Sequence, residues 1–227
     1  MVTVLSVGGS IVAPDTPDPE FLSRFGALAR QWLAEDNSRK LILVVGGGGP
    51  ARSYQKAFRA VCPDGSNEEA DWIGIMATRL NAQLLKAMFA DICPSDVVYD
   101  PTQAGVFAGR VMVAAGWKPG FSTDNDAVLL AERFSASTVI NLSNIAKVYT
   151  DDPRTNPDAK PIDSISWENF RKIVGDEWAP GKNVPFDPVA SMHAQKAGIS
   201  VICAAGRDIE NLRAILDGKD FVGTTIG

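Results

Sequence analysis

The chain has 227 residues, with 22 Lys and Arg against 27 Asp and Glu, which gives a net charge of −5 at neutral pH. This balance lacks the basic surplus of a dedicated nucleic-acid binder. Apolar residues make up 45% and charged residues 22%, which excludes disordered and collagen-like classes. The single histidine, His193, excludes a metal site built from several histidines. At this length we expect one domain over residues 1–227.

Cysteine usage and hydropathy indicate the compartment. Cys62, Cys93 and Cys203 are odd in number, far apart and without a CxxC pair, so a disulfide scaffold is not expected. No apolar run approaches the ~20 residues of a membrane span. The first residues, MVTVLSVGGS, carry no basic segment before their apolar run. We expect a cytoplasmic protein without membrane association.

The first half of the chain alternates strand patterns with helical ones. In chain order it predicts a strand at Val2–Val7, a helix at Pro19–Glu35, a strand at Leu41–Val45, a long helix from Ser66 or Asn67, and strands at Val97–Tyr99 and Arg110–Ala114. The run at 41–45 is continuously apolar, as expected of a strand covered on both faces. The long helix is expected to bury a stripe formed by Ile73, Ala77, Leu80, Leu84 and Met88.

The second half continues the alternation. It predicts a helix at Asp124–Phe134, a strand at Thr138–Leu142, helices at Trp167–Val174 and Pro188–Lys196, a strand at Ser200–Ala204, a helix at Ile209–Leu216 and a strand at Val222–Ile226. Tyr149–Pro161 is dense in Pro, Asp and Asn and predicts a long ordered loop. The whole pattern predicts a three-layer α/β/α sandwich around a mostly parallel sheet.

Glycine clusters follow the first two predicted strands. Gly8–Ser10 ends the first strand, and a tight turn is its simplest interpretation when it is taken alone. Gly46–Gly49 ends the second strand, with Pro50 as a plausible first helical residue. Four glycines cost conformational entropy that a simple turn does not require, so we favour anion binding at this helix N-terminus. Arg52, one turn into the helix, can form two parallel hydrogen bonds to a phosphate or lie solvated on the surface.

A third loop, Pro119–Asp126, places two hydroxyls and two carboxylates in five consecutive residues before a predicted helix. Capping the helix needs only one of them. The surplus indicates contacts to a substrate. Asp124 is placed to orient a basic group or a metal.

Together these motifs resemble the amino acid kinase superfamily and, within it, the archaeal-type UMP kinases. The resemblance is carried in order by Gly8–Ser10, GGGGPARSY (46–54), DWIGIMATRLNA (71–82), WKPGFSTDNDA (117–127), NLSNIAKVYTDDPRTNPDAKPI (141–162) and Gly223–Ile226. These segments span essentially the whole chain. The resemblance implies transfer of the γ-phosphoryl group of ATP to UMP, with Mg²⁺ as counter-ion, to give UDP and ADP. It also implies an oligomer, commonly a hexamer built as a trimer of dimers.

The resemblance implies roles for individual residues. The residues implied to bind ATP are Gly8, Gly9, Ser10, Gly47, Arg52, Ser143, Asn144, Tyr149 and Asp152. Those implied to bind UMP are Gly46, Asp71, Trp117, Lys118, Pro119, Gly120, Phe121, Ser122 and Thr123. Asp124, Arg52 and Lys160 would act at the transfer centre, and no residue would hold the metal directly, because Mg²⁺ comes with ATP.

Some of these residues have simpler interpretations. Tyr149, at a strand end, is also a typical core aromatic, and Lys160 is also a typical solvated loop lysine. Arg79 is a weaker candidate, which faces approximately the same way as Asp71 and could instead pair with a neighbouring acid.

The chain departs from the family pattern at specific positions. Ser6 stands where many superfamily members carry a lysine, two residues before the first glycine, although the archaeal type also lacks that lysine. The family's Asn-Val-Asp-Gly turn is replaced by Asn144–Lys147. Isopentenyl phosphate kinases use a histidine near the glycine loops, whereas His193 lies in a C-terminal helix and is interpreted as structural or surface.

Three alternatives stay open at this stage. The first is a kinase of the same fold for another small acid or phosphate, such as an amino acid or carbamate. The second is a non-catalytic nucleotide-binding or metal-oxoanion storage protein, which the single histidine disfavours. The third is NAD binding, because Gly46-x-Gly48-x-x-Ala51 fits the dinucleotide fingerprint. The acid that should end a second strand, Glu68 or Glu69, is instead predicted to open a helix.

Overall fold

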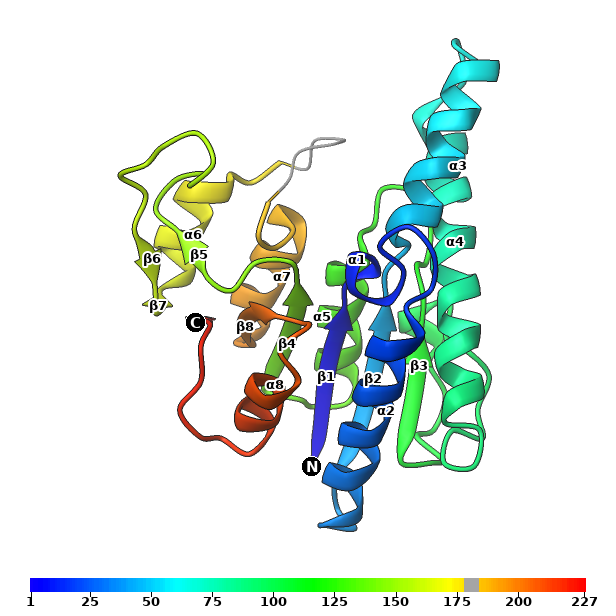
Figure 1. Cartoon of the computed structure of the whole chain (residues 1–227), viewed down its shortest axis with the longest axis vertical. Helices are drawn as coiled ribbons and strands as arrows, with labels where there is room; N and C mark the ends of the chain where they lie inside the picture. Colours follow the sequence, from blue (N-terminus) through cyan, green and yellow to red (C-terminus); the bar gives the residue numbers. More distant parts are fainter. Residues whose placement is uncertain (178–183) are drawn as a thin grey trace.

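The computed structural model describes residues 1–177 and 184–227, which are organised around a seven-stranded sheet (Figure 1). Its strands are β1 (Val2–Val7), β2 (Lys40–Val45), β3 (Val111–Ala114), β4 (Thr138–Ser143), β7 (Ser164–Ile165), β8 (Ser200–Ala205) and β9 (Thr224–Ile226). They lie in the order β3-β2-β1-β4-β8-β9-β7, and every neighbouring pair is parallel except β8 and β9. The predicted mostly parallel sheet is therefore confirmed.

Helices cover both faces of this sheet. The helices on one side are α1 (Gly9–Val12), α2 (Pro19–Ala34), α4 (Asn67–Met88), against which α3 (Gly48–Val61) packs, and α8 (Ile209–Leu216). Those on the other side are α5 (Thr123–Arg133), α6 (Trp167–Val174) and α7 (Pro188–Ala197). Side chains of β1 alternate between the two cores, because Leu5 and Val7 belong to the first and Val4 to the second. This is the predicted three-layer sandwich.

Smaller elements lie outside the seven-stranded sheet. β5 (Val148–Tyr149) and β6 (Pro161–Ile162) form a separate antiparallel pair at the two ends of the predicted Pro/Asp loop. A short 3₁₀ helix, η1 (Pro101–Gln103), packs on α5. Figure 1 shows β5, β6, β7 and α6 on one side of the molecule and the α3–α4 pair on the other.

Short polar side chains determine where the helices begin. Ser66 and Glu69 form a capping box at the start of α4. Glu69 therefore opens a helix and does not end a strand, which removes the basis for NAD binding. Ser122 caps α5 by accepting the Asn125 N–H at 3.2 Å. This cap fixes Asp124 in the first turn of α5.

Two predictions about elements were wrong. Val97–Tyr99 is not a strand, because only an isolated bridge between Val98 and Ala114 forms there. The buried stripe of α4 is also different, since Leu80 is 70% exposed. Ala77 is buried as predicted, and the other buried positions are held by Ala70, Ile75, Thr78, Asn81, Ala82 and Leu85. Polar Thr78 and Asn81 take inward positions because both form hydrogen bonds to loops of the sheet.

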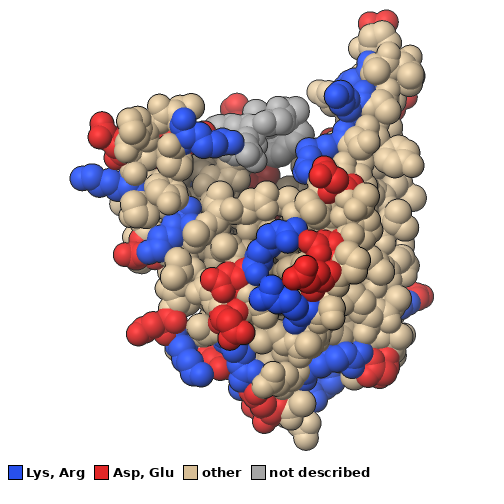
Figure 2. Space-filling model, in the orientation of Figure 1, with Lys and Arg blue, Asp and Glu red and all other residues tan. Residues whose placement is uncertain are grey.

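The surface carries both signs of charge. Figure 2 shows Lys and Arg side chains interspersed with Asp and Glu on the face that it draws. Over residues 1–177 and 184–227, the structure contains no helix with the length and apolarity required to cross a bilayer.

Candidate functional site

The carboxyl ends of β1, β2 and β4 meet at one edge of the sheet. The chain runs from β1 through β2 to β3 on one side and then places β4 and β8 on the other, so the strand order reverses between β1 and β4. Ligands of open α/β sheets bind at such a reversal. Figure 1 shows the arrowheads of these strands pointing to the end where α1 and the start of α3 lie. Both glycine loops are therefore placed at the expected ligand edge.

The two glycine loops are in direct backbone contact. A Cβ atom added to Gly9 would lie 2.0 Å from the Gly48 nitrogen and 2.6 Å from the Gly46 carbonyl carbon. A Cβ on Gly46 would lie 2.4 Å from the Gly9 nitrogen. Gly48 has a φ of +65°, in the left-handed region that glycine adopts without strain. The loops after β1 and β2 can touch only because these positions lack side chains.

Two of the predicted binding glycines already use their N–H groups within the fold. The Gly8 N–H donates to the Leu142 carbonyl at 2.9 Å, and the Gly46 N–H donates to the Val7 carbonyl at 3.0 Å. These bonds extend the parallel ladders beyond the ends of the strands. Gly8 and Gly46 therefore shape the loops rather than offer their amides to a ligand.

The amides at the helix starts are better placed for an anion. Gly9 and Ser10 open α1, and Gly47 and Gly48 stand at the start of α3. Amides in the first turn of a helix have no acceptor within that helix. The positive end of the α3 dipole adds to their attraction for phosphate oxygens. The structure brings these two sets of amides to one place at the sheet edge.

Helix α4 ties the second glycine loop to the loop that follows β3. The buried Asn81 side chain donates to the carbonyls of Gly46 at 2.9 Å and Gly47 at 3.2 Å. The Thr78 hydroxyl accepts the Gly116 N–H at 2.8 Å. The sequence analysis did not single out either side chain. Both are polar residues at inward positions of the helix, and a buried polar side chain needs a hydrogen-bond partner. That feature could have identified them from the sequence.

The predicted UMP-binding loop runs from the end of β3 into α5. The Trp117 and Phe121 rings pack with their centroids 4.8 Å apart, and the Lys118 Nζ lies 3.9 Å and 4.9 Å from the two centroids. From α4, the Asp71 carboxylate accepts the Gly120 N–H at 3.1 Å. The structure thus brings Asp71 against this loop. The other residues predicted in the loop are partly buried, namely Pro119, Ser122 and Thr123.

Asp124 lies where α5 meets the sheet edge. Its Oδ1 accepts the Ser6 hydroxyl at 3.0 Å, and its Oδ2 accepts the backbone N–H of Asp187 at 3.3 Å. Burial raises the pKa of Asp124 to about 6, the Ser6 hydrogen bond opposes that shift, and the negative charge of Asp187 adds to it. Ser6 occupies the position at which many superfamily members carry a lysine. Its hydroxyl therefore holds Asp124 through a hydrogen bond.

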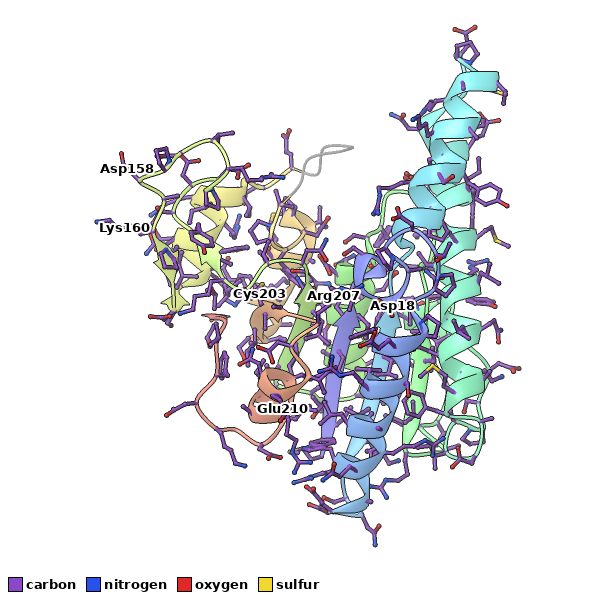
Figure 3. All side chains as sticks on the ribbon, in the orientation of Figure 1. Asp18, Asp158, Lys160, Cys203, Arg207 and Glu210 are labelled. Carbon is purple, nitrogen blue, oxygen red and sulfur yellow. The ribbon has the colours of Figure 1, made fainter. Side chains whose placement is uncertain are left out.

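The predicted cations do not contact Asp124 in the described part of the chain. Arg52 is exposed on α3, and its Nη2 donates to the Pro14 carbonyl at 2.9 Å. Figure 3 shows Lys160 on the outer side of the β5–β6 segment, far from the glycine loops. The structure thus leaves Arg52 beside the loops and does not bring Lys160 to them.

The predicted ATP side follows β4. Ser143 ends this strand, and its hydroxyl accepts the Ile145 N–H at 3.3 Å. Tyr149, in β5, is half-buried. Both Asp152 oxygens are engaged by the Arg154 guanidinium, at 3.0 Å from Nε and 2.8 Å from Nη2, and these bonds lower the pKa of Asp152 to about 2. Asp152 therefore carries a charge that is already paired.

The segment that departs from the family's turn, Asn144–Lys147, leads into contacts with the residue after β6 and with β9. Lys147 forms an ion pair with Asp163, and the Val148 N–H donates to the Thr224 hydroxyl at 2.8 Å. Asn144 is exposed before this anchor. Lys147 therefore supports the fold where the family's turn carries glycine.

His193 lies on α7 and faces α5. Its Nε2 is 2.9 Å from the Glu132 carboxylate, and its Nδ1 is 3.4 Å from the Asn125 side-chain oxygen. Both contacts join two neighbouring helices, as expected of a structural residue.

A second acid on α5, Asp126, has no solvent exposure. Its Oδ2 accepts the Trp117 N–H at 3.1 Å, whereas its Oδ1 has no partner. Burial raises the pKa of Asp126 to about 7, and the negative charges of Asp124 and Asp100 add to the shift. The sequence analysis counted this acid within the third loop and gave it no role of its own.

This environment predicts a pH-dependent stability. An aspartate in an unfolded chain has a pKa of about 3.9, so the folded state binds the Asp126 proton more tightly and loses stability as pH rises from about 4 to 7. Asp126→Asn removes that loss while keeping an acceptor for the Trp117 N–H. We expect the variant to exceed the wild type by about 2 kcal/mol in free energy of unfolding at pH 8, with the difference shrinking toward pH 4. Chemical unfolding at several pH values measures it, and a difference independent of pH would contradict the assigned cause.

The touching glycine loops, the partly buried acid and the adjoining acid-rich loop, all at the reversal of a parallel sheet, define an α/β protein built to bind phosphate groups. The model of the Amino acid kinase family matches residues 1–205. The chain belongs to the amino acid kinase family. It is 36% identical to the uridylate kinase of Methanospirillum hungatei over 226 residues, which cover 98% of this chain and 93% of the relative.

Other relatives also match this chain over its whole length. The uridylate kinase of Pyrococcus abyssi is 33% identical over 230 residues, covering 100% of this chain and 99% of the relative. Among solved structures, uridylate kinase from Archaeoglobus fulgidus superposes with a TM-score of 0.85 at 33% identity and full coverage of both chains. Aspartate kinase from Synechocystis gives a TM-score of 0.71 at 17% identity, with 100% of this chain and 39% of that chain covered, which shows a shared fold alone.

Proposed function

We propose that this protein transfers the γ-phosphoryl group of Mg-ATP to UMP and releases UDP and ADP. The observation that carries the proposal is the backbone contact between Gly9 and the loop at Gly46–Gly48. It places the amides of two helix starts next to each other, as a donor and an acceptor phosphate require. The relatives named uridylate kinase, which align over nearly the whole chain, support the choice of UMP.

Phosphoryl transfer requires in-line placement of the two substrates and neutralisation of charge on the moving oxygens. The amides of Gly9 and Ser10 would hold ATP phosphates, with Gly47 between donor and acceptor. The loop at 117–123 and Asp71 would hold the UMP side. Asp124 would organise the centre between them. Arg52 would reach a phosphate by exchanging the Pro14 carbonyl for phosphate oxygens.

The described residues fit a magnesium ion that arrives on ATP. Asp124 has a hydroxyl and an amide as partners rather than a cation, so its oxygens suit the neighbourhood of a metal-bound phosphate. When bound, Mg²⁺ would neutralise charge on the transferring oxygens.

The proposal is tested by measuring ADP release from Mg-ATP with UMP, CMP, AMP, glutamate, carbamate and isopentenyl phosphate in parallel. We expect strong turnover with UMP alone. Turnover with another acceptor and none with UMP would show that UMP is not the acceptor and would identify the compound that is. Absence of turnover with every acceptor, combined with measurable ATP binding, would favour a binding or storage protein.

We further propose that residues 1–227 act as one unit, with the N-terminal part mainly on the UMP side and the C-terminal part mainly on the ATP side. UMP-side residues Gly46 and Asp71 come before the midpoint, and ATP-side residues Ser143 and Asp152 come after it. A cytoplasmic location follows from the proposed substrates, which are metabolites of that compartment. Because the site needs no surface for nucleic acid or membrane, neither is proposed as a partner.

We propose that the protein is a homo-oligomer whose copies meet along α4. Four apolar side chains spaced one turn apart on this helix face outward, namely Trp72, Met76, Leu80 and Leu84. Figure 2 shows a largely uncharged surface on the side where α4 lies. A straight stripe on one helix can pack against the same stripe of a second copy around a two-fold axis. Such a dimer would be the building unit of the hexamer implied by the resemblance.

Leu80→Glu tests this interface. Leu80 is 70% exposed at the centre of the stripe, so a charge there is expected to disrupt the contact and leave the monomer folded. Light scattering after gel filtration should show a lower mass for the variant. Val106→Glu is the matched control, because Val106 is 86% exposed and lies outside α4. A wild type that is already a monomer, or an unchanged mass in Leu80→Glu, would contradict the proposal.

A further inference from the structure

The main chain of Trp117 is held from two directions. Its N–H donates to the Asp126 carboxylate on α5 at 3.1 Å. Its carbonyl accepts from Arg79 Nη2 on α4 at 3.0 Å. The same guanidinium lies 3.4 Å, through Nε, from the Gly116 carbonyl. The first residue of the proposed UMP loop is thus clamped between two helices.

On the arginine side of this clamp, the Arg79 side chain is stacked against aromatic rings as well as hydrogen-bonded. The Arg79 guanidinium lies 4.3 Å from the centre of the Tyr99 ring and 5.7 Å from that of Trp72. Stacking of this kind restricts the rotamers of a long side chain. The hydrogen bonds go to two successive carbonyls, which the planar guanidinium reaches from two of its nitrogens, whereas a lysine ammonium has a single nitrogen.

The acid side of the clamp is costly for the fold. Asp126 is fully buried, no Lys or Arg pairs with it in the described part of the chain, and one of its two oxygens has no partner. A buried carboxyl without a full set of partners destabilises a folded protein. Among residues 1–177 and 184–227, the hydrogen bond of its carboxylate is with the Trp117 N–H alone. Its effect on the structure is therefore concentrated at this loop.

Trp117 connects the clamp to the side chains of the proposed UMP loop. Its ring packs on Phe121, and Lys118 lies over both rings. Asp71 holds the same loop further along, at the Gly120 N–H. A shift at Trp117 would displace the aromatic pair and the lysine together, whereas the glycine loops would keep their own contacts.

We infer that Asp126 and Arg79 are positioning residues that clamp Trp117 and thereby set the affinity for the phosphoryl acceptor. They act through the loop and touch neither substrate. The inference deepens the proposed function, because the acceptor whose affinity is measured is UMP. It makes acceptor binding depend on two helices, while donor binding depends on the glycine loops.

Steady-state kinetics of Asp126→Ala is the first arm of the test. We expect the KM for UMP to rise about tenfold, the worth of one buried hydrogen bond, with the KM for ATP unchanged within about twofold. Asp126→Asn, which keeps an oxygen acceptor, should restore the KM for UMP. Glu132→Ala, which removes another acid from α5 and contacts His193 instead of the loop, is the control and should match the wild type. An unchanged KM for UMP in Asp126→Ala, or an equal rise for ATP, overturns the inference.

Hydrogen exchange at the Trp117 amide is the second arm and does not need turnover. The amide should exchange at least tenfold faster in Asp126→Ala and at the wild-type rate in Asp126→Asn. Arg79→Lys should also loosen the loop, and the kinetic effects of Arg79→Lys and Asp126→Ala should be less than multiplicative in the double variant. If the wild type turns over no UMP, the proposed function fails separately. Unchanged exchange in Asp126→Ala would overturn the clamp itself.

Discussion

Gly9→Ala is expected to abolish phosphoryl transfer, with a loss of at least 100-fold in kcat/KM, and to destabilise the fold by about 3 kcal/mol. The added methyl group would lie 2.0 Å from the Gly48 nitrogen. That atom belongs to the backbone of the second glycine loop and cannot move aside as a flexible side chain can. The two loops must therefore separate, and the donor and acceptor phosphates separate with them. Initial rates and thermal unfolding measure the two effects.

Gly105→Ala is the matched control for this substitution. A Cβ at Gly105 meets no atom within 4 Å, so the same chemical change is expected to leave activity and stability close to those of the wild type. If Gly9→Ala instead retained wild-type kcat/KM, contact between the two loops would not be a requirement of the reaction.

Asp124→Asn is expected to lower kcat by about 10²- to 10³-fold, comparable to the loss of one charge-stabilising group in other active sites. The amide oxygen can still accept the Ser6 hydroxyl, whereas the amide nitrogen cannot accept the Asp187 N–H, so the substitution removes the charge and one hydrogen bond of 3.3 Å. Substrate affinities should change much less than kcat.

Stability separates this loss from misfolding. Because burial raises the pKa of Asp124 to about 6, its charged form costs stability as pH rises from about 4 to 6. The neutral asparagine avoids that cost, so Asp124→Asn should unfold at the same temperature as the wild type or higher at pH 8. The exposed Asp64→Asn is the control and should leave kcat unchanged. A variant that keeps its kcat would remove Asp124 from the reaction.

The order of strands and helices was predictable from local sequence patterns. Val2–Val7 and Trp167–Val174 have the predicted bounds, because apolar periodicity and a serine cap define them. Val97–Tyr99 has strand composition, yet only Val98 finds a partner, in Ala114. Composition reports the preference of a segment and does not report which neighbour is within reach.

The face of α4 was not predictable from hydrophobicity. Leu80 points outward, whereas Asn81 is buried because the carbonyls of Gly46 and Gly47 need its amide. The hydrogen bonds that Asn81 donates to the Gly46 and Gly47 carbonyls therefore decided which face of α4 is buried, against the preference of the apolar Leu80 for burial. In the same way, anion binding was predicted at Gly46–Gly49 from the sequence, but the contact of this loop with Gly9 depends on β1 and β2 being neighbours.

The residues of the candidate site also fall into two groups, those placed by local sequence and those placed by tertiary contacts. The position of Asp124 follows from the Ser122 cap, which sequence spacing reveals. The partners of Asp126 and Arg79 come from segments far apart in the chain, and only the fold brings them to Trp117. Local motifs therefore singled out the residues that are proposed to face the substrates, whereas tertiary contacts were needed to find the residues that hold them.

If the chain joins an ATP site and a UMP site at the touching glycine loops, it must pass a phosphoryl group directly from one nucleotide to the other. The most direct measurement incubates the purified protein with Mg²⁺, UMP and ATP labelled at the γ-phosphate, and follows the label. We expect the label to appear in the β-phosphate of UDP, at a rate that depends on the UMP concentration, with little label in inorganic phosphate. Label found only in inorganic phosphate, or retained in ATP while both nucleotides bind, would contradict it.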